Sequence, residues 1–204
     1  MTVQLVEIED LKLHSPAGAI LQNFSTTVEE GEILFLRGPN GTGKSTFLRE
    51  LFSVLERQTN NPSIRLGNLR SFAYLPQSLN REFFVPLSLG EVAGLSWTAG
   101  GKPPKAEILR ALLPDAIVSR LWNVASGGEK QRAVLAQTLS NSHSLYLLDE
   151  PFNHLDQASI DTVAKIIKSL ASGGAAFLIA THTVPEGLNI PTVKTLSFRS
   201  REDP

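Results

Sequence analysis

The sequence of 204 residues contains no cysteine, which excludes disulfides, thiolate metal sites and cysteine nucleophiles. It also lacks an excess of either charge, since 19 basic and 20 acidic side chains give a formal net charge of −1. We therefore expect no nucleic-acid partner, because such proteins usually present a basic surface. No apolar run approaches the roughly 20 residues of a membrane helix, and the first residues lack the apolar core of a secretory signal. These absences predict a cytoplasmic protein without direct membrane insertion.

The remaining composition is that of an ordinary globular protein, with 42% hydrophobic and 19% charged residues. Its length suits a single domain over residues 1–204. Strand-like and helix-like segments alternate, which predicts an α/β fold with a mainly parallel sheet. The apolar–polar alternation of residues 3–13, paired with 19–28, predicts an N-terminal antiparallel β part. Further strands are expected at residues 32–37, 72–76, 144–149, 176–180 and 192–198.

Helices are expected at two places between these strands. From Lys44 onward, the residues Phe47, Leu48, Leu51, Phe52 and Leu55 fall on one helical face, and a second helix is expected near residues 157–171. Residues 88–122 differ, because repeated glycines and prolines divide them into two or three short helices. This pattern predicts a small helical subdomain at about residues 82–135.

A glycine-rich segment follows the expected strand 32–37 and fits the pattern G-x-x-x-x-G-K-[ST]. Glycines let the backbone approach an anion closely, and amides at a helix start point toward it. Lys44 is expected to reach the β- and γ-phosphates, and the Ser45 hydroxyl to ligate Mg²⁺. The pattern therefore predicts Mg-ATP binding, with a glycine-rich turn that binds nothing as the alternative. The candidate residues are Gly38, Pro39, Asn40, Gly41, Thr42, Gly43, Lys44, Ser45 and Thr46.

The apolar segment 144–149 ends in an acid and is followed by a second one. Asp149 is expected to hold Mg²⁺ through water at the carboxyl end of the strand. Glu150 then lies where it could polarise an attacking water. Such acidic pairs also occur as plain loop residues or helix caps, but the phosphate loop upstream favours the phosphoryl-transfer interpretation.

A Ser-Gly-Gly turn at residues 126–128 precedes another amphipathic segment, which makes it a second candidate anion site in the chain. With its neighbours it resembles the LSGGQ signature of ABC ATPases. In the expected order, residues 74–77 (YLPQ) resemble the Q-loop, 153–156 (NHLD) the D-loop and 181–182 (TH) the switch histidine. The chain therefore resembles an ABC-type nucleotide-binding domain with a P-loop NTPase core.

The resemblance implies that two such ATPase subunits, identical or homologous, pair head to tail around two ATP molecules. Each ATP would lie on the phosphate loop of one subunit and face the signature of the other. Carried over to this chain, Ser126, Gly127 and Gly128 would then contact the γ-phosphate held by the partner.

The same resemblance assigns roles around the chain's own phosphate loop. Glu150 would act as the general base, and His182 would bridge to the γ-phosphate, to which Lys44 also reaches. Gln77 would contact Mg²⁺ and water, and Asp156 would couple the two sites across the interface.

The sequence departs from the family pattern at three positions. Ala125 stands where the signature usually has Leu, which predicts looser packing of the helical subdomain without loss of phosphate contacts. Glu129 stands where Gln is usual, although Glu also occurs at this position in several ABC subfamilies. His14 is the candidate for stacking on adenine, because no Phe, Tyr or Trp lies near it in the sequence; nucleobase selectivity is therefore expected to be weak.

These features predict the ATPase subunit of a membrane ABC transporter, peripheral on the inner face of the cell membrane and working with a separate transmembrane permease subunit. The residue sequence of these motifs resembles that of metal-ion import ATPases, and the short chain resembles small haem-exporter ATPases. Residues 81–89 correspond to the groove that receives the membrane subunit in such transporters, although Phe83, Phe84 and Val85 could instead be ordinary core. The alternative function is a soluble ABC ATPase of the ABC-F or remodelling type.

Overall fold

A five-stranded sheet lies at the centre of the computed structural model, which describes residues 3–15, 18–57, 61–77, 83–95, 104–188 and 193–197. All neighbouring strands in this sheet are parallel, which confirms the predicted fold class, and each strand agrees with its expected range to within one residue at either end. The strand order is β5 (Phe72–Leu75), β6 (Leu145–Asp149), β7 (Ala176–Ala180), β3 (Ile33–Arg37) and β8 (Val193–Ser197).

A separate antiparallel sheet contains the N-terminal strands, as expected from their alternating pattern. Strand β1 (Gln4–Ser15) pairs on one side with β2 (Gly18–Glu29) and on the other with β4 (Ile64–Leu66). The sequence pattern did not indicate β4, because a three-residue strand is too short to display an alternation.

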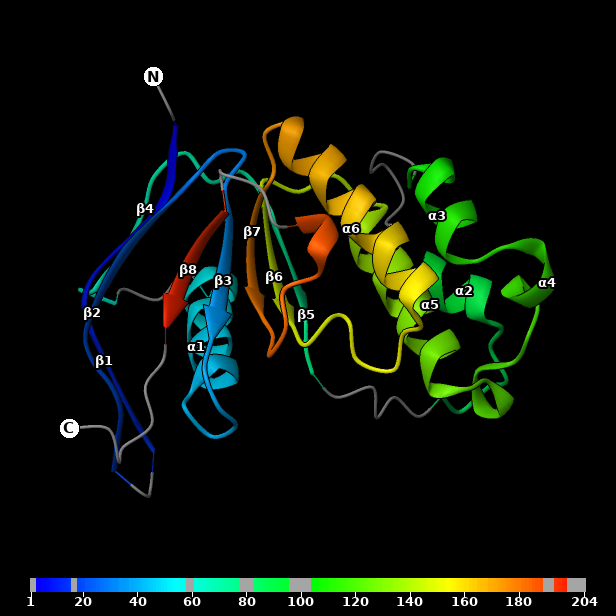
Figure 1. Cartoon of the computed structure of the whole chain (residues 1–204), viewed down its shortest axis with the longest axis horizontal. Coiled ribbons are helices and arrows are strands. Elements are labelled where there is room, and N and C mark those ends of the chain that lie inside the picture. Colours follow the sequence, from blue (N-terminus) through cyan, green and yellow to red (C-terminus); the bar gives the residue numbers. More distant parts are fainter. Residues whose placement is uncertain are drawn as a thin grey trace.

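One face of the parallel sheet packs against helix α1 (Lys44–Arg57) and the antiparallel sheet (Figure 1). Because side chains alternate along a strand, Leu34 and Leu36 of β3 point to this side. The apolar face of α1 differs slightly from the expected one, since Phe52 is half-buried and contacts aromatic rings of β5, while Val54 is buried.

The opposite face is covered by helices α5 (Gly127–Leu139) and α6 (Gln157–Ser172) (Figure 1). Ile33 and Phe35 of β3 point to this side, and the rings of Tyr146 and Phe177 stack here at 4.7 Å. Both faces of the sheet are therefore covered at strands β3, β6 and β7, which is why these three strands appear in the sequence as apolar runs without alternation.

Short helices lie on the far side of α5 from the sheet (Figure 1). These are α2 (Leu89–Gly94), α3 (Ala106–Leu112), α4 (Asp115–Val118) and the 3-10 turn η1 (Trp122–Val124); a second 3-10 turn, η2 (Glu186–Leu188), follows β7. Because α2 and α3 both contact α5, we propose that this part of the chain is the helical subdomain of about residues 82–135. Within the described residues, no helix is long and apolar enough to cross a bilayer.

The segment leading into α2 was expected either to line a groove or to be core. Phe83 is half-buried and packs against Trp122 with ring centroids 5.6 Å apart. In contrast, Phe84 is fully exposed and Val85 is 59% exposed. The core interpretation is therefore wrong for Phe84 and Val85, and only Phe83 packs against the core.

The carboxyl ends of the parallel strands lie together at the lower edge of the sheet in Figure 1. The loops that leave β3, β5, β6 and β7 therefore meet there, although they are far apart in the sequence. In open α/β sheets this edge is where ligands bind.

Candidate active site

The glycine-rich loop connects the end of β3 to the start of α1. Gly41 and Gly43 have φ values of 81° and 99°, a region that glycine adopts without strain. Buried Thr42 holds the turn by donating its hydroxyl proton to the Pro39 carbonyl, at 2.9 Å. The loop is therefore a fixed turn at a helix N-terminus, which is the arrangement that binds phosphate.

The Lys44 side chain lies within this loop. Its ammonium group donates to the carbonyl oxygens of Gly38, at 2.7 Å, and of Pro39, at 2.9 Å, and the residue is buried. The positive charge is thus held among the loop atoms, next to where an anion would bind.

A hydroxyl and a carboxylate meet at the base of the loop. Ser45, in the first turn of α1, donates to Asp149 Oδ1 at the end of β6, at 2.9 Å. Burial raises the pKa of Asp149 above its ordinary value, whereas the Ser45 hydrogen bond and the charges of Arg49 and Lys44 act in the opposite direction. A half-buried hydroxyl oxygen in contact with a buried carboxylate oxygen forms the kind of donor pair that Mg²⁺ prefers.

A pocket of about 420 Å³ opens beside this pair. Gln77, exposed just after β5, lines the pocket, and its contact with Mg²⁺ stays a prediction; Tyr74 had been named only as part of the Q-loop motif, and Arg49 was missed. Burial, followed by the nearby Asp149 charge, raises the pKa of Tyr74 to about 12, so its phenol keeps its proton at neutral pH. The pocket is lined by Ser45, Arg49, Tyr74, Pro76, Gln77 and Asp149.

The next residue pair joins the loops after β6 and β7. Glu150 Oε1 lies 3.1 Å from His182 Nε2, and the Glu150 amide donates to the Ala180 carbonyl at 2.8 Å. Glu150 has a φ of 50°, which is unusual for a residue other than glycine and concentrates at functional sites. Burial raises the pKa of Glu150, and the neighbouring His182 and Lys44 partly counter it.

The Ser-Gly-Gly turn starts helix α5 and packs against the D-loop of the same chain. A Cβ atom on Gly128 would lie 2.6 Å from the His154 carbonyl oxygen, so this position requires glycine. One turn further on, the buried Gln131 amide donates to the Pro151 carbonyl at 2.8 Å, a contact that the sequence did not suggest. Ser126 and Gly127 themselves are exposed.

Residues 21–153 match the family described as ABC transporter. The chain belongs to the ABC transporter family. It is 36% identical over 183 residues to the cytochrome c biogenesis ATP-binding export protein CcmA of Ruegeria sp. (strain TM1040), covering 87% of this chain and 85% of that protein. It is 30% identical over 185 residues to the zinc import ATP-binding protein ZnuC of Jannaschia sp. (strain CCS1), covering 88% of this chain and 73% of that protein.

A solved ATP-binding subunit of an ABC transporter has the same fold, with a TM-score of 0.70 and 26% identity over 87% of this chain and 79% of its own. ABC transporter ATP-binding domains bind ATP and are ATPases, and this chain is such a subunit. The relatives are transporter subunits, which favours the transporter interpretation over the ABC-F alternative.

The remaining residues assigned by the phosphate-loop pattern and the ABC resemblance are Asp156, Thr46, Asn40 and His14. Asp156 is exposed and caps α6 by accepting a hydrogen bond from the Ser159 amide at 2.8 Å; the bonds to Ser159 lower its pKa. Thr46 is half-buried in the first turn of α1, and Asn40 is exposed on the loop. The backbone of His14 belongs to β1, but its side chain lies outside the described part of the structure, so its stacking on adenine stays a prediction.

Proposed function

We propose that this ABC subunit binds Mg-ATP on loop residues 38–45, hydrolyses it with Glu150, and powers a separate membrane subunit. The observation that carries this proposal is the pairing of Ser45 with Asp149 at 2.9 Å and of Glu150 with His182 at 3.1 Å, beside one phosphate loop. Phosphoryl transfer needs a metal-binding carboxylate and a water-activating base side by side.

The metal position fits the residues present. Ser45 and Asp149 offer two oxygens in contact, and Gln77 lines the same pocket. Bound there, Mg²⁺ would neutralise the charge of the phosphate oxygens. Lys44 and the loop amides would hold the phosphates, as their positions in the loop favour.

Glu150 and His182 would act on the attacking water and on the γ-phosphate during hydrolysis. A carboxylate with a raised pKa is a stronger proton acceptor than an ordinary one, so Glu150 is suited to take a proton from an attacking water. The His182 side chain lies beside Glu150, with Nε2 3.1 Å from Glu150 Oε1, and it is 44% exposed, so its ring can reach toward a γ-phosphate.

A second ATPase subunit, either another copy or a homologue, completes the site. Ser126 caps α5 and Gly127 begins it at an exposed turn, where the Ser126 hydroxyl proton and the Gly127 amide would meet a partner's nucleotide. His154 of the D-loop lies against the same turn, and Asp156, which caps α6 at the end of that loop, would couple the two sites.

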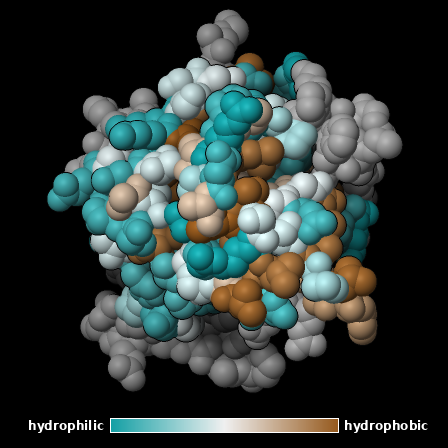
Figure 2. Space-filling model, turned by 90° about the vertical axis from the view of Figure 1, so that its right-hand side faces the viewer, coloured by the Kyte–Doolittle hydropathy of each residue, from teal (hydrophilic) through white to brown (hydrophobic). Residues whose placement is uncertain are grey.

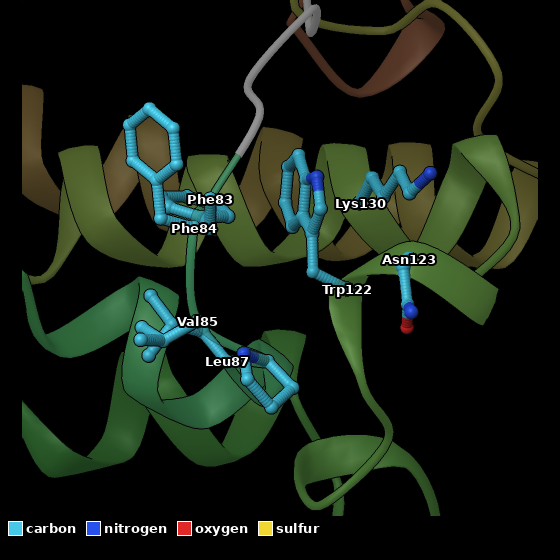
Figure 3. Close-up of a pocket in the computed structure, with 8 residues that line it drawn as sticks. Phe83, Phe84, Val85, Leu87, Trp122, Asn123 and Lys130 are labelled. Carbon is cyan, nitrogen blue, oxygen red and sulfur yellow. The ribbon is translucent and has the colours of Figure 1, made fainter.

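The membrane subunit would dock on the face formed by the short helices, where apolar side chains reach the surface (Figure 2). A groove of about 500 Å³ lies there, and the segment bearing Phe84 and Val85 runs past α5 with the Trp122 ring beside it (Figure 3). An exposed apolar groove suits a helix from a membrane protein. Docking would hold the subunit at the inner face of the membrane, and the cargo would be set by the membrane subunit.

The direct test is steady-state ATPase activity together with nucleotide binding. Glu150→Gln is expected to abolish turnover but retain ATP binding, because glutamine cannot accept the proton from water. Lys44→Ala is expected to weaken ATP binding by removing a phosphate contact. Wild-type turnover in Glu150→Gln, or unchanged ATP affinity in Lys44→Ala, would refute these roles.

The partner is tested separately by affinity capture from native membranes. Recovery of a polytopic membrane protein supports the transporter role. Recovery of ribosomes instead would favour the ABC-F alternative.

A further inference from the structure

Glu129 places a carboxylate in the signature, where the family usually has a neutral glutamine. Its Oε2 atom accepts from the Ser126 amide at 2.9 Å, and its Oε1 atom pairs with the Arg120 guanidinium. The Ser126 amide and Arg120 hold the pKa of Glu129 below its ordinary value, so the group is ionised at neutral pH. A negative charge therefore lies one helical turn from the serine expected to meet a phosphate.

The same cap fixes how Ser126 uses its hydroxyl. The Ser126 oxygen accepts the Glu129 amide hydrogen at 3.3 Å, which completes a capping box. A serine hydroxyl carries a single proton. Because the protein uses this hydroxyl as an acceptor, its proton can be donated outward to a phosphate oxygen.

The Glu129 carboxylate alone would repel such a phosphate. A partly buried site screens the repulsion between like charges less than water does. Arg120 supplies the compensating charge, and its backbone is held firmly. The Leu89 amide donates to the Arg120 carbonyl at 2.8 Å, and the Arg120 amide donates to the Ile117 carbonyl at 2.9 Å. The neighbouring cation Lys130 instead lies over the Trp122 ring, 5.6 Å from its centroid.

We propose that Arg120 is a positioning residue for ATP hydrolysis: by neutralising and orienting Glu129, it allows the Ser126 turn to accept the γ-phosphate of ATP held by a second subunit. This inference rests on the proposed function, because it requires a site shared between subunits. A signature with glutamine at this position needs no such cation.

The test compares kcat and KM for MgATP in the full chain across Arg120→Ala, Arg120→Lys, Glu129→Gln and the double variant Arg120→Ala/Glu129→Gln. Arg120→Ala is expected to lower kcat/KM about fivefold, as for a half-exposed ion pair that acts on a charged ligand. Arg120→Lys and Glu129→Gln should stay near wild type. The double variant should recover wild-type kcat/KM, because the neutral cap leaves no charge to compensate. Arg110→Ala, an exposed arginine on α3, is the matched control.

Rescue by Glu129→Gln separates a charge role from packing, since a packing defect at Arg120 would persist in the double variant. Wild-type kcat/KM in Arg120→Ala, or equal loss in the single and double variants, would overturn the inference. Either result would leave the proposed function intact as long as wild-type turnover depends on Glu150. A wild-type chain without ATPase activity would contradict the proposed function itself, and the inference with it.

Discussion

Burial raises the pKa of Asp149, whose side chain is almost fully removed from water at the end of β6. A carboxyl whose pKa is higher in the folded state than in the unfolded chain stabilises the fold only at low pH, and that contribution is lost as pH rises through the folded pKa. At neutral pH, the Asp149 charge therefore costs folding free energy. A metal-binding role accounts for keeping it there.

Asp149→Asn should accordingly stabilise the nucleotide-free protein by about 1 kcal/mol, because it removes a buried charge but keeps an acceptor for Ser45. The same change should remove the additional stability gained from MgATP. Thermal unfolding with and without MgATP measures both effects. A lower melting temperature with an intact MgATP response would show that Asp149 is structural.

Glu150 makes a prediction for the pH dependence of turnover. A general base works only when it is deprotonated, so the rate should fall as pH decreases through its pKa. Because burial raises the pKa of Glu150, this fall should begin at a higher pH than for an exposed glutamate, whose pKa is about 4.3. A profile of kcat against pH tests this, and an acid limb at or below the ordinary glutamate pKa would argue against Glu150 as the base.

At the residue scale, some residues of the site could be identified from the sequence and others only from the structure. The phosphate loop, Asp149 and Glu150 stand out as short local patterns, whereas His182 was assigned only through its place in the ABC motif order; the roles of all four stay predictions. Arg49 could have been found from its spacing of four residues after Ser45, to whose carbonyl its Nε donates at 3.3 Å. Tyr74 was part of the Q-loop motif, but its proximity to Asp149 could not be predicted, nor could the pairing of Arg120 with Glu129, because both depend on tertiary contacts.

At the scale of elements, the start of α5 and the D-loop are packed so closely that no Cβ fits between them at Gly128. A Cβ on Gly128 would meet the His154 carbonyl, which is backbone and cannot rotate away. Gly128→Ala should therefore shift the Ser-Gly-Gly turn and lower turnover on the order of tenfold to a hundredfold. ATP binding to the phosphate loop should be retained.

Parallel measurements of ATPase rate and nucleotide affinity check this prediction. Gly94→Ala is the matched control, since a Cβ there meets nothing within 4 Å. Turnover in Gly128→Ala equal to that of the control would mean that the junction does not position the signature.

The elements themselves were largely predictable, for a physical reason. Strands buried on both faces appear as apolar runs, and α6 begins at an Asp cap and follows a clear helical period. The pairing partners of those strands could not be obtained in this way. The order β5-β6-β7-β3-β8 results from crossovers whose packing is tertiary, and β4 is too short for a pattern.

At the scale of the whole molecule, the groove beside Trp122 makes a prediction about the membrane partner. Phe84→Asp places a charge on a fully exposed apolar side chain, so it should reduce recovery of the membrane subunit without unfolding the chain. Leu66→Asp, at an exposed position of β4 in the antiparallel sheet, is the control and should not affect recovery. Equal recovery with both variants would place the docking surface elsewhere.

The sheet edge gathers the phosphate loop, Asp149, Glu150 and His182 within one chain, whereas the signature begins at an exposed turn of α5. The central claim is that this signature serves the nucleotide of a second subunit. The most direct measurement is the solution mass of Glu150→Gln by light scattering, with and without MgATP. The shared site predicts a monomer that doubles in mass when MgATP is added, and a further Ser126→Ala change should weaken that doubling. A mass unchanged by saturating MgATP, in a variant that binds ATP, would contradict a site shared between two copies of this chain.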